Sequence, residues 1–213
     1  MKRAKILLAD DHRIVAEGLR GLLEPEFELV GIVEDGRAML EAVDKHKPDV
    51  VVADVSMPLL NGIDAVRLLK KKNKNIAVVF LTMHLDVAYA ASALEVGASG
   101  YVLKHSAPSE LVTAIKSALK GRTYITPLLA GELIQYHKKK PQSEEGEIAR
   151  LTSRQREVLQ LLAEGHSVKE IAAILQISTR TVEFHKYSMM EALGLKSSAE
   201  LVRFAVKHGI ITE

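Results

Sequence analysis

The sequence predicts an α/β fold, a doubly wound five-stranded parallel sheet, followed by a second, smaller all-α domain. Two observations predict the sheet. Short β-rich runs alternate five times with helical patterns over residues 1–125, and runs such as 50–52 are apolar throughout, as in strands buried on both faces. The helical domain is predicted by three helix-start signals that lie within about fifty residues of one another after position 150.

The strands of the sheet are expected at residues 4–9, 29–33, 50–53, 76–81 and 101–103. Between them, apolar residues recur at helical spacing, most clearly around 14–23, 65–69 and 111–119. Pro108 is expected to open the last of these helices and Gly121 to close it, since proline suits the first helical turn and glycine the end.

The second half of the chain has a different pattern. Residues 137–147 contain no apolar side chain, which is typical of a linker. Three residue pairs then have the spacing of a capping box, namely Thr152 with Gln155, Ser167 with Glu170, and Ser197 with Glu200. Gly165 and Gly194 stand where helices should end. The expected division is therefore an α/β domain over 1–125, a terminal helix extension and linker over 126–149, and a helical domain over 150–213.

Composition excludes several kinds of function. Without cysteine the chain has no disulfide, no thiolate nucleophile and no Cys-ligated zinc. The longest unbroken apolar run, 76–81, is far shorter than the ~18 residues of a membrane span, and the basic N-terminus lacks a signal peptide's apolar stretch. A soluble cytoplasmic protein is expected. Residues 150–213 carry 9 basic and 7 acidic side chains, the whole formal excess of +2, which weakly favours a nucleic-acid partner.

Polar side chains follow four of the expected strands. Asp10 and Asp11 follow the first strand, Asp54 the third, Thr82 the fourth and Lys104 the fifth. Because the carboxyl ends of parallel strands meet at one edge of a sheet, we expect these side chains to lie together. Crowded carboxylates repel one another unless a cation is present, and Mg2+ typically binds one or two carboxylates plus a phosphate. The sequence therefore predicts a magnesium and phosphoryl site.

Asp54 is the best candidate nucleophile because it stands alone at its strand end, opposite the acidic pair. Attack of its carboxylate on a phosphoryl group gives an aspartyl phosphate, with Lys104 supplying positive charge and Thr82 a hydrogen bond. The simpler explanations are that the acidic pair caps a helix and that Lys104 is only solvated. Each signal is weak alone, and their ordered placement at four strand ends favours the site.

These residues and their neighbours resemble the receiver domain of two-component response regulators, over residues 1–125. The matching segments are Asp10-Asp11, Asp54 followed by Val-Ser-Met-Pro, Asn61-Gly62, 81–84 and 100–104. The resemblance implies a flavodoxin-like fold in which Asp54 accepts a phosphoryl group from a cognate sensor histidine kinase.

The same resemblance assigns roles around Asp54. It implies that Mg2+ is bound by Asp10, Asp11, Asp54 and the backbone carbonyl of Ser56. It also implies that Thr82 and Tyr101 are switch residues, Thr82 moving towards the phosphoryl group and the ring of Tyr101 filling the vacated space, while Pro58 and Gly62 shape the loop beside the site.

Two helices, expected at 167–175 and 179–193 with residues 176–178 between them, fit a helix-turn-helix. In the second helix Val182, Met189 and Leu193 share a face that should point to the core. Another face follows the spacing i, i+3, i+4, i+7 and carries the candidates for the DNA major groove, with one lysine beside it for phosphate: Arg180, Glu183, Phe184, Tyr187 and Lys186.

The segment 151–159, with 162–165, 169–172, 177–178, 181–182 and 193–195, closely resembles the LuxR-type helix-turn-helix domain over 150–213. Together the two resemblances imply a phosphorylation-switched, sequence-specific transcription factor that forms a homodimer when phosphorylated or bound to double-stranded DNA. The expected DNA-binding residues are Lys169, Thr179, Arg180, Thr181, Glu183, Phe184, Lys186 and Tyr187. The expected dimer contacts, in a last helix over 199–207, are Leu201, Val202 and Ala205, although packing within the domain accounts for part of this surface.

Glu183 departs from the family, in which base-reading positions often carry lysine. A glutamate carboxylate cannot donate hydrogen bonds to guanine as lysine does, but it can accept one from cytosine N4. The target sequence should therefore differ from that of lysine-bearing relatives. The alternative is that Glu183 is a solvated charge that pairs with Lys186.

Two other functions compete with this interpretation. A metabolite phosphatase with an aspartyl nucleophile is disfavoured because Ser56, and no general acid, stands two residues after Asp54, and because no cap domain is present. The chain is thus not expected to be an enzyme beyond its own phosphoryl transfer and dephosphorylation. A pure docking module with a helical interaction tail would lack preference for one DNA sequence. A further hypothesis is that the unphosphorylated receiver covers the recognition helix.

Overall fold

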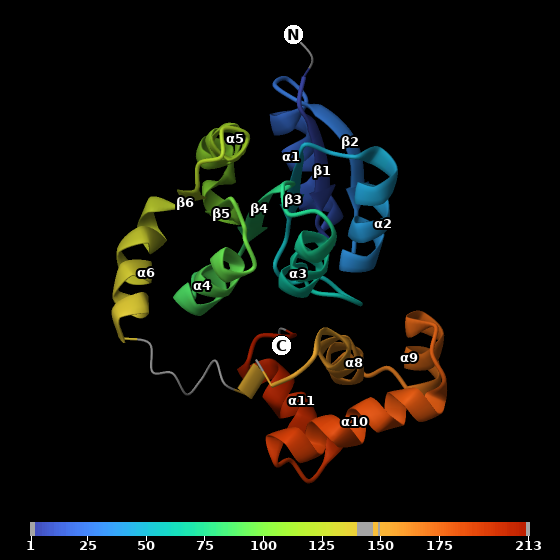
Figure 1. Ribbon diagram of the computed structural model, residues 1–213. Coiled ribbons are helices and arrows are strands. Elements are labelled where there is room, and N and C mark those ends of the chain that lie inside the picture. Colours follow the sequence, from blue (N-terminus) through green and yellow to red (C-terminus); the bar gives the residue numbers. More distant parts are fainter. Residues whose placement is uncertain (1–2, 140–146, 149, 212–213) are drawn as a thin grey trace. The chain divides into compact units, whose positions relative to one another are not determined.

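The computed structural model describes residues 3–139, 147–148 and 150–211, and it divides into two units, 1–140 and 141–213 (Figure 1). The first unit is a parallel sheet covered by helices, and the second is helical in its described part. Of the linker predicted over 137–147, residues 137–139 belong to a helix and 140–146 lie outside the described residues. The domain boundaries given above stay predictions. Within the described residues, no helix combines the length and apolar composition that crossing a bilayer requires.

The elements of the first unit are β1 (Lys5–Ala9), α1 (Arg13–Leu23), β2 (Glu28–Val33), α2 (Gly36–His46), β3 (Val50–Ala53), α3 (Gly62–Lys72), β4 (Ala77–Thr82), α4 (Val87–Glu95), β5 (Gly100–Leu103), the 3-10 turn η1 (Lys104–Ser106), α5 (Ala107–Ala118), β6 (Tyr124–Ile125) and α6 (Pro127–Lys139). The expected strands are all present, with ends within one residue of the prediction. Pro108 lies in the first turn of α5, as predicted, because its missing N–H is not needed there.

The strands follow the order β2-β1-β3-β4-β5-β6, and every neighbouring pair is parallel. The predicted doubly wound parallel sheet is confirmed, and the structure adds a sixth strand to the five predicted. This strand, β6, has two residues, Tyr124 and Ile125, which pair with Gly100 and Tyr101 of β5. So short a strand leaves no periodic signal in the sequence, because pairing with β5 fixes its extended conformation.

Helices cover both faces of the sheet (Figure 1). α1 and α5 pack on one face through residues such as Leu19 and Ile115. α2, α3 and α4 pack on the other face, and α6 extends this second core through Leu129. Since both faces are covered, central strands such as Val50–Ala53 are completely buried, which explains their continuous apolar sequence.

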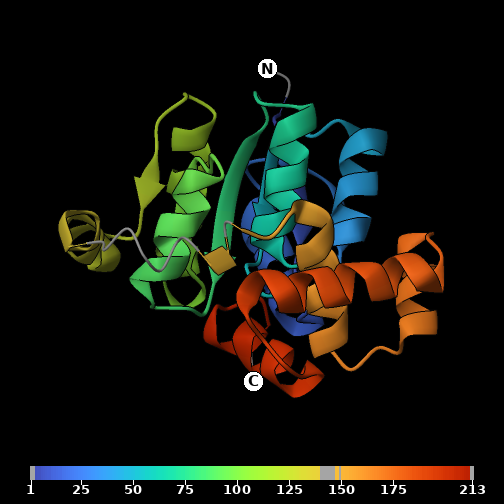
Figure 2. The ribbon, with the colours of Figure 1, turned by 60° about the horizontal axis from the view of Figure 1, so that its bottom comes forward.

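The second unit, drawn in orange and red in Figure 2, contains α8 (Ser153–Ala163), α9 (Val168–Leu175), α10 (Thr179–Leu193) and α11 (Ser198–Lys207). Gly165 and Gly194 follow α8 and α10 with φ of 89° and 68°, the left-handed conformation that ends a helix and that glycine adopts without strain. Gln176 is the C-cap of α9 and Ser178 the N-cap of α10, so the predicted tight connection between these two helices is observed.

The three predicted helix starts are also observed. Reciprocal capping boxes open α8 and α9, formed by Thr152 with Gln155 and by Ser167 with Glu170. At α11 the hydroxyl of Ser197 accepts the N–H of Glu200, but the carboxylate of Glu200 accepts the N–H of Lys196 instead of closing the box. These caps satisfy backbone N–H groups that have no partner inside their own helices.

Candidate functional site

The register of the sheet brings two buried acids together. Ala9 pairs with Ala53 across β1 and β3, so Asp10 and Asp54 leave adjacent strands at the same level. The N–H of Asp54 donates to the carbonyl of Ala9 at 2.8 Å, which fixes that level. β1 and β3 flank the point where the strand order reverses, and ligands of open α/β sheets bind outside the strand ends at this point.

Lys104 lies between these two acids. Its Nζ is 2.7 Å from Oδ2 of Asp54 and 2.8 Å from Oδ2 of Asp10, and the side chains of all three residues are at most 5% exposed. Burial raises the pKa of Asp54, although the charge and hydrogen bond of Lys104 oppose that rise. Burial would lower the pKa of Lys104, but the charges and hydrogen bonds of Asp54 and Asp10 outweigh it, so the pKa is raised. The site therefore holds a permanent ammonium.

Asp11 and His12 complete the acidic edge. Nδ1 of His12 lies 2.8 Å from Oδ1 of Asp11 and 3.5 Å from Oδ1 of Asp10. The acidic pair does not cap α1, because the cap residue is His12, whose own side chain makes no capping hydrogen bond. Oδ1 of Asp10 accepts the N–H of His12 at 2.9 Å, before the helix begins. The simpler explanation of the pair as a helix cap is thereby excluded. His12 was missed in the sequence, where its adjacency to two acids was the signal available.

The donor set fits a hard divalent cation. One ligand atom each from Asp10, Asp11, His12 and Asp54 can be chosen so that all four lie within 4.8 Å of one another. Oδ2 of Asp10 is buried and accepts no hydrogen bond among the described residues, although the ammonium of Lys104 is close. A buried carboxylate oxygen with free capacity, beside other carboxylates, is what an oxygen-preferring cation requires.

Thr82 and Tyr101 are joined to this edge through His84. Oγ1 of Thr82 accepts the N–H of His84 at 3.1 Å, and the hydroxyl of Tyr101 donates to the carbonyl of His84 at 3.2 Å. The imidazole of His84 lies 2.7 Å from Oγ of Ser56 and stacks on Tyr89 with 4.4 Å between ring centroids. Burial raises the pKa of Tyr101, which keeps its phenol protonated and able to donate.

The ring of Tyr101 is already inside the first unit. Tyr101 and Thr82 are both 0% exposed. The inward position of the ring is the one observed, and the coupled movement of Thr82 and Tyr101 on phosphorylation stays a prediction. The ring fits there because its hydroxyl donates to the carbonyl of His84 and it belongs to the same buried cluster as the alanines of α4.

The loop that follows Asp54 is shaped by backbone geometry. Leu59 has φ of 64°, Pro58 accepts the N–H of Leu60 at 2.7 Å, and the N–H of Gly62 donates to Val55 at 2.8 Å. A Cβ at Gly62 would collide with the carbonyl oxygen of Asp54. The predicted role of Gly62 beside the site thus has a steric basis, because the chain passes too close to Asp54 for any side chain.

On α10 the predicted groove-facing residues share one exposed face. Arg180, Glu183, Phe184 and Tyr187 are exposed, as are Thr179 and Lys169, while Thr181 and Lys186 are half-buried. Val182 and Met189 are 0% exposed on the opposite face, which fixes the rotation of the helix. No ion pair joins Glu183 to Lys186 within the described residues, so the alternative that Glu183 is a paired surface charge has no support.

The three predicted dimer contacts on α11 are buried or half-buried. Leu201 and Ala205 are 1% and 0% exposed, because α11 packs against α8 within the second unit. This corrects the prediction for those two residues, whose side chains stabilise the unit itself. Val202 is half-buried and is the one of the three that remains partly accessible to a second copy.

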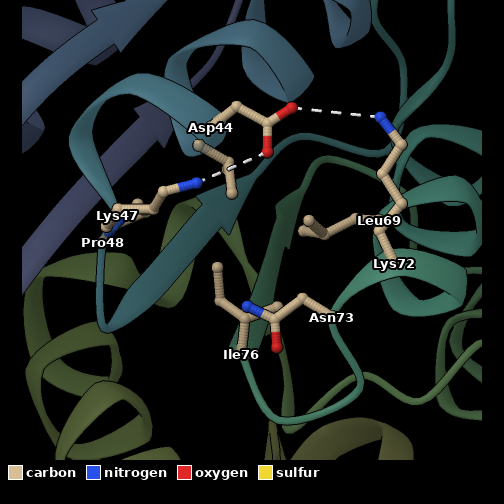
Figure 3. Close-up of a pocket in the computed structure, with 8 residues that line it drawn as sticks. Asp44, Lys47, Pro48, Leu69, Lys72, Asn73 and Ile76 are labelled. Carbon is tan, nitrogen blue, oxygen red and sulfur yellow. Dashed lines mark ion pairs between the residues drawn. The ribbon is translucent and has the colours of Figure 1, made fainter.

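A pocket of about 320 Å3 lies at the other end of the sheet (Figure 3). Its lining residues precede β3 and β4, whereas Asp54 and Thr82 end them. In Figure 3 the carboxylate of Asp44 lies between the ammonium groups of Lys47 and Lys72, at 3.7 and 3.9 Å. These side chains are mostly exposed, so the two ion pairs contribute little to stability.

Each of the two units matches a known protein family. The family model of the response regulator receiver domain matches residues 6–116, and that of the bacterial regulatory proteins of the luxR family matches residues 149–205. The chain is 33% identical to the transcriptional regulatory protein DegU of Brevibacillus brevis, covering 97% of this chain and 94% of that protein. It is 36% identical to the transcriptional regulatory protein MctR of Rhizobium johnstonii, covering 99% and 97%.

A solved structure shows the same architecture. RcsB from Salmonella enterica serovar Typhimurium, bound to promoter rprA in the presence of the phosphomimetic BeF3−, is 32% identical with a TM-score of 0.55, covering 94% of this chain and 97% of that chain. The acids at the sheet edge, the helix-turn-helix and these matches lead to one conclusion. The chain belongs to the two-component response regulators, as a transcription regulator with a receiver domain followed by a LuxR-type DNA-binding domain.

Proposed function

We propose that Asp54 is the phosphoacceptor of this response regulator and that its phosphorylation by a sensor histidine kinase switches binding to a specific DNA sequence. One observation carries the proposal: the ammonium of Lys104 lies 2.7 Å from the carboxylate of Asp54 and 2.8 Å from that of Asp10. A phosphoryl group attached to Asp54 would meet a fixed positive charge at once. Phosphoryl transfer depends mainly on such positioning and charge neutralisation.

Asp10, Asp11 and Asp54, with the backbone carbonyl of Ser56, would hold Mg2+. When bound, this ion would neutralise phosphoryl oxygens during transfer. Asp54 supplies the attacking carboxylate oxygen, the P–N bond of the kinase's phosphohistidine breaks, and its imidazole leaves. Lys104 exchanges its contact with the carboxylate oxygen for one with a phosphoryl oxygen. The carboxylate must be ionised to attack, and the charge of Lys104 favours this form against the effect of burial.

Thr82 would report the phosphoryl group to the rest of the receiver domain. Its hydroxyl donates to a phosphoryl oxygen, and the N–H of His84 then loses the acceptor that Thr82 now provides. His84 also accepts from Tyr101, so a change at Thr82 reaches both the β4–α4 segment and the switch tyrosine. This route supports a change of surface around residues 83–103.

The output would be a homodimer that binds double-stranded DNA through α10, with Lys169 and the exposed face of α10 towards the duplex. Arg180 and the half-buried Lys186 would bind phosphates, and Glu183 would accept a hydrogen bond from cytosine N4. The RcsB structure bound to promoter rprA supports this use of a LuxR-type domain. We place the protein in the cytoplasm, with access to DNA and to a kinase, and expect no turnover of free phosphomonoesters.

Labelling with acetyl phosphate tests the acceptor. The full chain with Mg2+ should gain one acid-stable, base-labile phosphoryl group, detected by mass spectrometry, and EDTA should prevent it. Asp54→Asn should remove the label, whereas Asp44→Asn, at an exposed acid distant in the fold, should keep it. A label that persists in Asp54→Asn would move the acceptor elsewhere. Steady hydrolysis of phosphomonoesters would instead indicate a phosphatase.

A further inference from the structure

Phe184 is exposed, unlike the other phenylalanines of this chain. Phe27, Phe80 and Phe204 are 5%, 0% and 8% exposed, whereas Phe184 on α10 is 67% exposed. Its ring meets the edge of the His185 ring at 5.8 Å between centroids, which buries little of it. Leaving so large an apolar ring in water gives up the stabilisation that burial would provide, so folding of the domain does not explain its place.

The surroundings of Phe184 point to a recognition surface. Tyr187, one turn further on the same face, is 63% exposed, and among the described residues after 147 no other large apolar side chain is as exposed. A single exposed apolar residue is ordinary, but two aromatic rings on successive turns of one face are not. Arg180 and Glu183 on the same face add one basic and one acidic group to the two rings.

We propose that Phe184 reads the C5-methyl group of a thymine in the major groove, at a position next to the base that Glu183 reads. This inference rests on the proposed function, in which α10 enters that groove. The thymine methyl is the one apolar group that the major-groove edges of the bases offer, and phenylalanine is among the side chains that contact it. Phe184 and Glu183 are adjacent in the helix, so together they select thymine and cytosine at neighbouring positions of the half-site.

Tyr187 differs from Phe184 in its neighbour and in its chemistry. Nζ of Lys186 lies 5.9 Å from the centroid of the Tyr187 ring, so this ring is already next to a cation. Its hydroxyl can donate to a phosphate, a contact that carries no sequence information. The side chain of Phe184 has no hydrogen-bonding group. It can therefore distinguish thymine from the other bases only through an apolar contact with the methyl group.

Replacement of thymine by deoxyuridine tests the proposal, because it removes only the methyl group. The preferred site of the phosphorylated full chain is first selected from random DNA, and each thymine of a half-site is then replaced singly. At the thymine that Phe184 contacts, binding of the unsubstituted protein should weaken about fourfold, the effect of about one buried methylene-sized group. Fluorescence anisotropy at one fixed salt concentration measures the dissociation constants.

Protein variants test whether Phe184 itself contacts the thymine methyl group. Phe184→Ala should bind the thymine and deoxyuridine sites equally, and Phe184→Leu should keep part of the difference. Ile134→Ala, which truncates a side chain 59% exposed on α6, should discriminate as the unsubstituted protein does. Since Phe184 and Ile134 are both exposed, thermal unfolding should be nearly unchanged in all three variants.

The failure of this proposal differs from the failure of the proposed function. If the protein prefers its selected site to bulk DNA but tolerates every deoxyuridine, Phe184 is not a methyl reader and the proposed function stands. If Phe184→Ala keeps the full fourfold difference, another residue reads the methyl group and the proposal is overturned. If no DNA sequence is preferred, the proposed function itself fails, and this inference fails with it.

Discussion

At the scale of single residues, Lys104 supplies the positive charge that offsets the repulsion between two buried carboxylates. Asp10 and Asp54 are 94 and 50 residues away from it in the sequence, and both accept hydrogen bonds from its ammonium. Buried like charges raise each other's pKa unless a cation lies close, and the fixed ammonium fills this need. The same charge that stabilises the two carboxylates would also stabilise the phosphoryl group.

Lys104→Met should therefore destabilise the receiver domain in EDTA by about 3 kcal/mol, because both acids lose their buried counter-charge. Mg2+ should recover more of this loss in the variant than it adds to the unsubstituted protein, since the ion then supplies the missing charge. Urea unfolding followed by tyrosine fluorescence measures it, as four of the five tyrosines, at 89, 101, 124 and 136, lie in the receiver unit.

Lys116→Met is the matched control for this measurement. Lys116 pairs with Glu26 at 3.0 Å, but both side chains are 49% exposed. An exposed pair of this kind contributes about 0–1 kcal/mol, so its loss should be small. Equal destabilisation by the two variants would show that the buried triad has no special weight.

At the scale of elements, the short strand β6 pairs with β5 at the edge of the sheet and leads directly into α6. Thr126, 2% exposed, follows β6, and its N–H donates to the carbonyl of Tyr101 at 3.0 Å. Its hydroxyl donates to Glu110 of α5 at 2.7 Å and accepts the N–H of Leu103 at 3.2 Å. One threonine thus connects β5, α5 and the start of α6, directly beside Lys104.

Thr126→Val keeps the shape of this side chain but removes its hydroxyl. The N–H of Leu103 and the carboxylate of Glu110 would lose their partner, so stability should fall by about 1–3 kcal/mol. Thr126→Ser should restore most of it, and Thr113→Val, at an exposed site on α5, should have little effect. Urea unfolding followed by tyrosine fluorescence distinguishes these variants. A Thr126→Val protein as stable as the unsubstituted one would contradict the role.

The capping box of α9 predicts a dependence on pH. Hydrogen bonds from the side chain and the backbone of Ser167 lower the pKa of Glu170. Since the folded pKa lies below the unfolded one, of about 4.3, the carboxylate stabilises α9 fully above that value. The contribution is lost as the pH falls through the folded pKa.

Hydrogen exchange of the α9 amides, corrected for intrinsic rates, checks this prediction. Protection in the unsubstituted protein should decrease below about pH 4.3 relative to Glu170→Gln, whose amide does not titrate there. Glutamine keeps the cap, as Gln155 shows by accepting the N–H of Thr152 at 2.8 Å in α8. The same pH dependence in both proteins would exclude Glu170 as its source.

At the scale of the whole molecule, the chain divides into two compact units, 1–140 and 141–213. The hypothesis that the unphosphorylated receiver covers α10 predicts that the fragment 148–213 binds its site about tenfold more tightly than the unphosphorylated full chain, a coupling of ordinary size. Phosphorylation of the full chain should recover the difference.

The measurement is a titration of the selected site with each protein, after circular dichroism has shown that the fragment is helical. The fragment carrying Arg180→Ala should lose affinity for all sequences alike, as expected for a phosphate contact. Equal affinity of the fragment and the unphosphorylated full chain would leave the hypothesis of a covered recognition helix without support.

The sequence by itself determined the parallel sheet, the order of polar residues at its strand ends, the helix caps and the helix-turn-helix. These features depend on residues within a few positions of one another, for example Ser167 and Glu170, and on the rule that parallel strands place their carboxyl ends at one edge.

The tertiary structure decided what depends on residues far apart in the chain. It added β6, it placed Tyr101 inside the domain, and it buried Leu201 and Ala205. The sequence shows these four features poorly because pairing with a distant strand and packing against another helix leave no local pattern. Lys104 is the clearest case, since its residue type was visible in the sequence but its position between two buried acids is fixed only by the register of the sheet.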